Sequence, residues 1–260
     1  MKNLTLLILS TSLLTTCSTT PTGRHQLKLM PESQMTAMGN QSFEKMKQQQ
    51  RLTQNSDYKN LVNCITDRLL KANGENPKDW KVSVFEDKSP NAFALPGNNI
   101  GVHTGMIELV ENEDQLAAVI GHEIGHVHAD HGNERVSQNM VQNLGLQVAA
   151  ISLGQDDKTD QLLLAGLGLG LQFGVLMPFS RKHESEADQL GIKYMARAGF
   201  NPDQASELWK VMDKKSAGSP PEFLSTHPSP QSRIEALAKL APKHEQAYLN
   251  SRNQYKTCKR

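Results

Sequence analysis

The chain has 260 residues, of which 37% are hydrophobic, 21% are charged and 5% are aromatic. This composition is typical of a globular protein with one sizeable hydrophobic core. The formal net charge of +1 argues against nucleic acid or a charged membrane surface as the main partner.

The chain begins with a segment typical of a bacterial signal peptide. Residues 4–14 are largely apolar and too few to span a membrane. The residues before Cys17 resemble a lipobox, although Thr16 stands where a smaller residue is usual, and cleavage there would leave Cys17 to carry lipid. Ser18 favours the outer membrane over the inner one. We therefore expect residues 1–16 to be a lipoprotein signal peptide and the protein to be lipid-anchored on the periplasmic face of the outer membrane, with ordinary secretion to the periplasm as the alternative.

Two helices are predicted before the first strand. Residues 17–57 are polar and are expected to form an N-terminal tether with a helix over residues 32–50, where methionine and phenylalanine recur at helical spacing. Apolar residues also share one face over residues 58–72, and NGENP ends that second helix. Cys64 in this helix and Cys258 near the end of the chain could pair in an oxidising compartment, and the sequence leaves the pairing open.

A strand, a turn and a second strand follow. WKVSVFED (80–87) alternates and is β-branched, which predicts a strand. Residues 96–99 predict a turn and residues 100–103 a second strand. Asn112 can then cap a helix that opens with acidic residues and that Gly132 can close.

The second half of the chain begins with an apolar, glycine-containing run at residues 161–177. It is slightly short for a transmembrane helix, so we expect a buried or interfacial segment beside the functional site, with membrane contact as the alternative. Helices are then predicted over residues 181–199, from Asn201-Pro202 onward, and from Ser229-Pro230 to Leu240.

VIGHEIGHVHADHG (119–132) contains the pattern H-E-x-x-H at residues 122–126. Residues four apart lie on one face of a helix, so His122 and His126 can bind the same Zn²⁺. Glu123 points to the side of that pair, where it can accept a proton from water that attacks a peptide carbonyl and pass it to the leaving amine. The pattern therefore predicts a zinc hydrolase.

A catalytic zinc site needs a third protein ligand and an open position. HESEAD (183–188) supplies two carboxylates on one helical face, Glu184 and Asp188. Glu184 can bind the metal, while Asp188 can accept the other ring N–H of a ligating histidine and fix its tautomer. Glu186 points elsewhere on the helix and is a weaker candidate. Taken alone, the two acids would be a solvated stripe, but H-E-x-x-H upstream favours a metal site.

These motifs together resemble metallopeptidase family forty-eight, the zinc gluzincins that include HtpX-, BepA- and LoiP-like proteins and the CAAX prenyl proteases. H-E-x-x-H is followed by E-x-x-A-D at residues 184–188. SPNAFALPGNNIGVHTGMI (89–107) is similar to the family's N-A-F segment and substrate-binding strand. PFSRKHESEADQLGI is similar to its S-R-x-x-E-x-x-A-D stretch, and STHPSPQSRI to its T-H-P-x-x-x-x-R-I segment. The resemblance covers about residues 23–240.

The resemblance implies a mostly helical α+β fold, in which a zincin-like metalloprotease domain has a small β-sheet beside the H-E-x-x-H helix. We expect this domain over residues 58–245 and a C-terminal tail over residues 246–260. Glu123 would be the general base. The ligands of one Zn²⁺ per chain would be His122, His126 and Glu184.

Two further site residues follow from the resemblance. His227 aligns with a family histidine near the metal, where an imidazole can stabilise developing negative charge or occupy the open position as a ligand, and both roles stay open. Pro228 favours an extended conformation at His227. Asn91 aligns with an asparagine near the substrate backbone, and a substrate strand is expected to pair with an exposed sheet edge near Asn98 to Val102.

The remaining histidines lack ligand spacing. His128 lies about 200° around the helix from His126, and His131 sits near the predicted helix end. The same lack of a supporting pattern holds for His25, His103 and His183. The glycines at positions 121 and 125 are expected to let the helix pack closely on a neighbour.

The leading interpretation is a zinc-dependent endopeptidase that cuts periplasmic and outer-membrane proteins, among them misfolded or unassembled envelope proteins. The alternative is a chaperone or assembly factor whose zinc site is held closed and which cleaves little. Glu123 argues against a purely structural metal, since a closed site has no use for a base, whereas His227 allows latency. A third interpretation is that residues 161–177 make it mainly a membrane-interacting protein.

Overall fold

A computed structural model of the protein describes residues 17–152, 179–215, 222–227 and 231–259. The predicted signal peptide and the apolar run at 161–177 lie outside the described residues. The described α-helices are α1 (Glu32–Gln49), α2 (Ser56–Ala72), α3 (Thr104–Leu109), α4 (Glu113–His128), α5 (His131–Ser152), α7 (Arg181–Arg197), α8 (Gln204–Lys215), α9 (Glu222–Thr226), α10 (Gln231–Leu240) and α11 (Glu245–Ser251). The described strands are β1 (Cys17–Thr19), β2 (His25–Leu27), β3 (Lys81–Phe85), β4 (Ala92–Leu95) and β5 (Asn99–His103).

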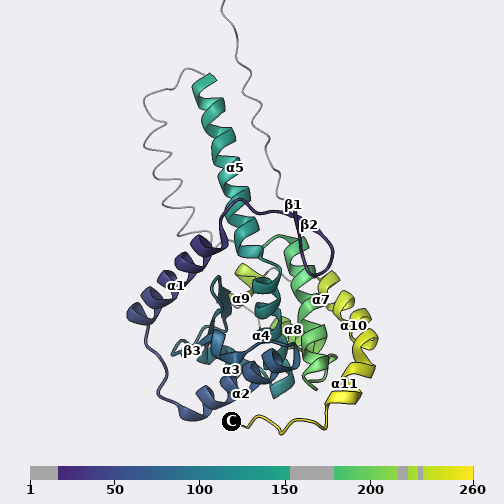
Figure 1. Cartoon of the computed structure of the whole chain (residues 1–260). Coiled ribbons are helices and arrows are strands. Elements are labelled where there is room, and N and C mark those ends of the chain that lie inside the picture. Colours follow the sequence, from purple (N-terminus) through teal and green to yellow (C-terminus); the bar gives the residue numbers. More distant parts are fainter. Residues whose placement is uncertain (1–16, 153–178, 216–221, 228–230, 260) are drawn as a thin grey trace, which may run out of the picture.

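Helices α4 and α7 run through the middle of the body and pack against each other (Figure 1). The three-stranded sheet lies to one side of α4, and α5 projects away from the body (Figure 1). The predicted fold class is therefore confirmed: a mostly helical α+β structure with a small sheet beside the H-E-x-x-H helix. The predicted helices over residues 32–50, 58–72 and 181–199 are present to within two or three residues at each end.

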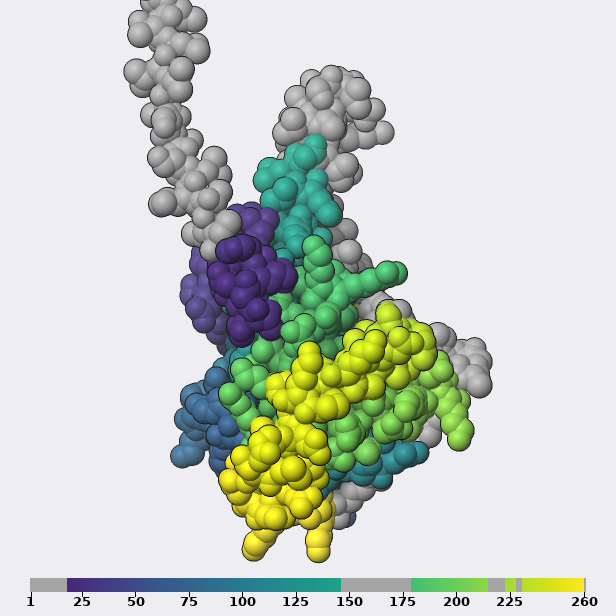
Figure 2. Space-filling view, turned by 90° about the vertical axis from the view of Figure 1, so that its right-hand side faces the viewer, coloured from purple at the N-terminus to yellow at the C-terminus, as the bar shows by residue number. Residues whose placement is uncertain are grey.

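One large hydrophobic core joins α2, the sheet, α4, α7 and α8. Its members on α2, β5 and α4 include Leu61, Ile65, Ile100, Val102, Leu116 and Ile120. On the face shown in Figure 2, the C-terminal residues (yellow) lie across the green residues of α7 and α8. Among the described helices, none combines the length and the apolar character needed to cross a bilayer.

The sheet differs from the prediction in one strand. Its order is β3-β5-β4, with β3 parallel and β4 antiparallel to β5. Because β5 is the central strand, the expectation that Asn98 to Val102 form an exposed edge is wrong. The predicted turn causes this: Gly97 and Asn98 have φ angles of 81° and 62°, and this left-handed pair folds the chain back into a hairpin. The edge strand that contacts α4 is β4, which the sequence analysis did not identify.

The end of α4 also differs from the prediction. Asn112 caps the helix as expected, its side chain accepting a hydrogen bond from the backbone N–H of Gln115 at 2.9 Å. The helix ends at His128, however, and Asp130 then adopts a left-handed conformation with φ of 54°, which aspartate tolerates better than most residues. A second helix, α5, begins directly afterwards and includes Gly132. The predicted role of Gly132 as the terminator is therefore wrong.

Helices α4 and α7 approach each other through glycines. A Cβ atom on Gly191 would lie 3.0 Å from the backbone nitrogen of His122, and one on Gly125 would lie 3.0 Å from the carbonyl oxygen of Ala187. Gly121 also faces Gly191, so the predicted close packing at Gly121 and Gly125 is confirmed. This close approach places the two histidines of H-E-x-x-H beside the first turn of α7.

A disulfide joins Cys64 on α2 to Cys258, which follows α11. It links residues 194 positions apart and so attaches the C-terminal segment to the body. Because such a cross-link restricts the unfolded chain, Cys258→Ser is expected to lower the free energy of unfolding by about 2–4 kcal/mol in urea denaturation. Dithiothreitol should destabilise the wild type equally and leave the variant unchanged. A variant as stable as the oxidised wild type would contradict the prediction.

Candidate metal centre

The two histidines of H-E-x-x-H lie one turn apart on α4 and face the same point. His122 and His126 are both buried, and their Nε2 atoms are 3.0 Å apart. Burial holds the pKa of His126 well below its usual value. Burial also lowers the pKa of His122, but hydrogen bonds to Asp188 and Glu184 outweigh it and raise this pKa to about 9. A cation that binds His122 must therefore displace a proton.

Glu184 reaches the same point from α7. Ser180 caps this helix by accepting a hydrogen bond from the backbone N–H of His183, and Glu184 lies in the first turn. The Glu184 carboxylate lies 3.4 Å from Nε2 of His122 and 3.4 Å from Nε2 of His126. Burial raises the pKa of Glu184, but the facing histidines, above all His227, hold it well below its usual value. The predicted ligands are thus brought together with Glu184 as an anion.

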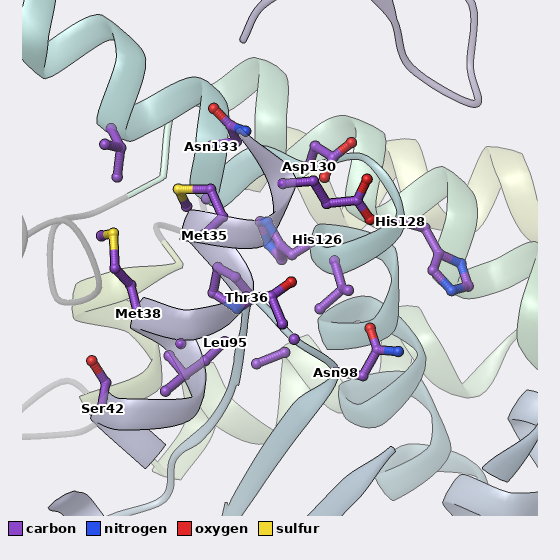
Figure 3. Close-up of a pocket in the computed structure, with 18 of the residues that line it drawn as sticks. Met35, Thr36, Met38, Ser42, Leu95, Asn98, His126, His128, Asp130 and Asn133 are labelled. Carbon is purple, nitrogen blue, oxygen red and sulfur yellow. The ribbon is translucent and has the colours of Figure 1, made fainter. Parts of the chain in front are cut away.

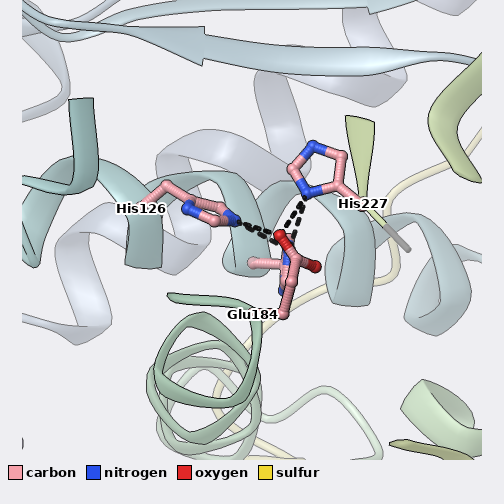
Figure 4. A group of neighbouring side chains, drawn as sticks. His126, Glu184 and His227 are labelled. Carbon is pink, nitrogen blue, oxygen red and sulfur yellow. Dashed lines mark hydrogen bonds and ion pairs between the residues drawn. The ribbon is translucent and has the colours of Figure 1, made fainter. Parts of the chain in front are cut away.

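His227 completes the cluster from the residue directly after α9. Its Nδ1 atom lies 3.0 Å from the Glu184 carboxylate and 3.2 Å from Nε2 of His122. Figure 4 shows His126 and His227 on either side of the Glu184 carboxylate. The His227 ring stacks on Phe223, with 4.4 Å between the ring centroids, and the backbone N–H of Phe223 donates to the carbonyl of Pro90. These contacts tie the position of His227 to the chain that leads into β4.

Four side chains can each offer one atom to a metal and are called the four donors below: His122, His126, Glu184 and His227. They have the spacing and the chemistry that zinc requires. The contacts among them run from 3.0 to 3.4 Å, and all four ligand atoms lie within 4.8 Å of one another. Donors bound to one tetrahedral zinc at about 2.0–2.1 Å lie about 3.3 Å apart. Three imidazoles and a carboxylate are also ligands that zinc prefers. The cluster therefore fits one zinc ion with protein side chains in all four positions.

Asp188 and Arg233 hold two of these donors in place. The Asp188 carboxylate lies 3.0 Å from Nδ1 of His122, the ring nitrogen that faces away from the cluster. Arg233 donates to both carboxylates, at 2.7 and 2.8 Å to Asp188 and at 2.6 Å to Glu184. The predicted contact between Asp188 and a ligand histidine is therefore present. Arg233 lies in the segment STHPSPQSRI, and the sequence predicted no role for it.

Glu123 lies beside the cluster and is not one of its four donors. It is buried, and its Oε1 atom is 3.3 Å from Nε2 of His227. Burial raises the pKa of Glu123, which moves it toward the range where a carboxylate works as a base near neutral pH. The two buried acids therefore have different positions, as the helical spacing predicted. Glu184 is one of the four donors, and Glu123 stands next to them.

Residues 57–241 of the chain match the model of peptidase family M48. The chain belongs to this family. It is 36% identical over 183 residues to the mitochondrial metalloendopeptidase OMA1 of Schizosaccharomyces pombe, which covers 70% of this chain and 52% of that protein. It is 31% identical over 182 residues to the beta-barrel assembly-enhancing protease of Escherichia coli K12, covering 66% of this chain and 37% of that protein. The chain thus spans about half, or less, of these relatives' lengths.

The other predicted residues of this M48 chain lie outside the four-donor cluster. Asn91 is buried directly before β4, and its carbonyl accepts a hydrogen bond from the backbone N–H of His103. Cys17 opens β1 and is paired in register with Leu27 of β2, and its lipidation stays a prediction. The four-donor group does not contain His25, His103, His128, His131 or His183.

Sequence reasoning missed a second layer of contacts behind His126. Nδ1 of His131 lies 2.9 Å from Nδ1 of His126, and Nε2 of His131 lies 3.1 Å from the Glu186 carboxylate. Arg24, in the turn between β1 and β2, donates to Glu186 at 2.8 Å and to Glu134 at 2.6 and 2.8 Å. Only the acidic character of HESEAD pointed to Glu186, and no local pattern pointed to Arg24 or His131.

A cavity of about 490 Å³ opens beside His126. Helix α1 forms one side of it with Met35, Met38 and Ser42, and Figure 3 shows His128 and Asn98 on the other side. The family match begins at residue 57, so this wall comes from outside the matched region. The cavity is large enough for substrate side chains and borders the edge strand β4 as well as the cluster.

Proposed function

We propose that the protein is a zinc-dependent endopeptidase. The observation that carries this proposal is the four-donor cluster with Glu123 beside it and outside it. A metal that only stabilises the fold needs no buried carboxylate next to it, whereas hydrolysis needs a base within reach of the attacking water. Membership of peptidase family M48 supports the same reaction class.

In this proposal His122, His126 and Glu184 hold the zinc ion. When bound, zinc polarises the peptide carbonyl and makes water more acidic. Glu123 takes the proton from the attacking water and passes it to the leaving amine. Asp188 keeps the Nδ1 proton on His122, so that its Nε2 lone pair points at the metal.

The proposed substrate is an extended segment of a protein. Strand β4 is the sheet edge that contacts α4, so a substrate strand can add to it and present its backbone to the cluster. The cavity between α1 and β4 would take a substrate side chain. Main-chain pairing selects unfolded chains with little sequence preference, which suits unassembled envelope proteins. The likeness to a beta-barrel assembly-enhancing protease supports this substrate class.

We further propose that this reaction takes place on the periplasmic face of the outer membrane, with a lipid on Cys17 as the anchor.

A second candidate function is a latent zinc protein that assists assembly and cleaves little. His227 favours it, because its Nδ1 atom stands among the donors where a catalytic site keeps an open position.

Removal of the metal tests the peptidase proposal. The purified protein is expected to contain one zinc per chain by elemental analysis and to cleave casein. Dialysis against a chelator should remove both the zinc and the cleavage, and one equivalent of zinc should restore both. Magnesium added in place of zinc is the control and should not restore cleavage, because it prefers oxygen ligands in octahedral geometry. Cleavage that persists after the metal has been removed would refute the proposal.

A further inference from the structure

The two histidines of α4 are supported from behind in different ways. Each has one ring nitrogen facing the cluster and one facing away. The outward nitrogen of His122 meets a carboxylate directly, that of Asp188. The outward nitrogen of His126 meets another imidazole, that of His131, which in turn meets the carboxylate of Glu186. His126 is therefore connected to a carboxylate only through one intervening residue, His131.

The hydrogen-bond directions along this second route follow from its far end. Arg24 is always protonated and donates its Nε–H to Glu186 at 2.8 Å, and the Thr22 hydroxyl donates to the other carboxylate oxygen. Glu186 is therefore an acceptor, and the matching donor on His131 is its Nε2–H. A neutral His131 then has its lone pair on Nδ1, where it accepts the Nδ1–H of His126. This order leaves the lone pair of His126 on Nε2, which faces the cluster.

We infer that His131, Glu186 and Arg24 form a hydrogen-bonded positioning chain that fixes the tautomer and the orientation of His126. The inference rests on the proposed function, since it takes zinc as the ion that His126 holds. None of the three residues is placed as a ligand or as the base. They act through His126, in the way that outer partners of ligating histidines do elsewhere.

The N-terminal hairpin is thereby part of the metal centre. Arg24 sits in the turn between β1 and β2, before the region that matches the family at residues 57–241. Its guanidinium bridges two helices, since Glu186 lies on α7 and Glu134 on α5. Glu134 also lies 3.1 Å from Nε2 of His183, so the same carboxylate connects the hairpin to the first turn of α7. A loss of Arg24 would release Glu186 and loosen His131, which has no exposed surface.

The first test measures how long the protein keeps its zinc. Zinc-loaded protein is mixed with excess chelator, and metal release is followed with a chromogenic zinc indicator. His131→Phe keeps a ring against His183 but removes the acceptor for His126, and it is expected to speed zinc release about 10–100-fold. Arg24→Gln should speed it as well, by a smaller factor. Arg24→Lys should recover part of that loss, because one ammonium can still donate to a carboxylate.

Lys28→Gln is the matched control. Lys28 follows the same hairpin, its side chain is 25% exposed like that of Arg24, and it forms an ion pair with Asp130. Asp130 is not one of the four donors and lies outside the route from Arg24 to His126, so this variant should release zinc at the wild-type rate. Thermal unfolding of the metal-free proteins separates a loosened site from a damaged fold. A variant that still unfolds in one cooperative transition above the assay temperature has kept its fold, and a change in its zinc release then belongs to the site.

The outcomes for the positioning chain and for the peptidase are distinct. Wild-type zinc release in both His131→Phe and Arg24→Gln would overturn the positioning chain whatever the activity. Equally fast release in Lys28→Gln would also overturn it, because the effect would then belong to any cation of the hairpin. A third outcome is fast zinc release in the His131 and Arg24 variants but not in Lys28→Gln, together with a Glu123→Gln variant that still cleaves normally. That outcome would support the positioning chain and refute the proposed function. The kinetic signature of positioning is a lower kcat in Arg24→Gln with an unchanged KM.

Discussion

Replacement of Glu123 by glutamine is expected to abolish peptide cleavage and to leave the zinc bound. Glutamine has the shape of glutamate but cannot take a proton from water. Removal of a general base costs about 10²–10⁴-fold in rate, so kcat for casein or a peptide substrate should fall at least about 10²-fold. Glu123 is not among the four donors, so zinc content by elemental analysis should stay at one per chain.

The two halves of this prediction separate the roles of the two buried acids. Glu184→Gln removes a donor and should lower both the zinc content and the activity, whereas Glu123→Gln should lower the activity alone. Glu235→Gln, at an exposed position of α10, controls for the loss of one carboxylate and should change neither. If Glu123→Gln cleaved as well as the wild type, the assignment of peptidase chemistry to this site would be wrong.

Much of the site was predictable because its chemistry is encoded at helical spacing. His122 and His126 lie four residues apart, as do Glu184 and Asp188, so each pair shares a face of its helix whatever surrounds it. The start of α4 was also predictable, because Asn112 is a residue that caps helices. A pattern on one helix thus identifies half of the site, and the resemblance to a family joined the two halves.

The contacts that support the site were not predictable from local patterns. Arg24 lies 162 residues from Glu186 in the chain, and Arg233 lies 45 residues from Asp188. No period or spacing relates such positions, because only the packed fold brings them together. The edge strand β4 was missed for a different reason. AFAL is short and follows directly on a loop, and its pairing depends on the left-handed turn at Gly97.

We expect His227 to determine whether this site is open or closed in solution. As a fourth ligand it would exclude substrate, and as a donor to developing negative charge it would accelerate the reaction. The structure places its Nδ1 atom 3.0 Å from Glu184 and its Nε2 atom 3.3 Å from Glu123. In this position it neighbours both a proposed ligand and the proposed base. We therefore expect the wild-type protein to be largely latent.

His227→Ala is expected to raise casein cleavage about tenfold or more. If the open form is a minor state of about 0.1–10%, removal of the ring that closes the site makes most molecules competent. The opposite role predicts the opposite sign, since loss of a charge-stabilising donor costs about 10²–10³-fold in kcat. The measurement is the initial rate at matched zinc content, so that lost metal is not mistaken for lost catalysis. His25→Ala removes an exposed histidine and should leave the rate unchanged. A His227→Ala protein that keeps its zinc and is less active than the wild type would refute latency and assign His227 to the reaction itself.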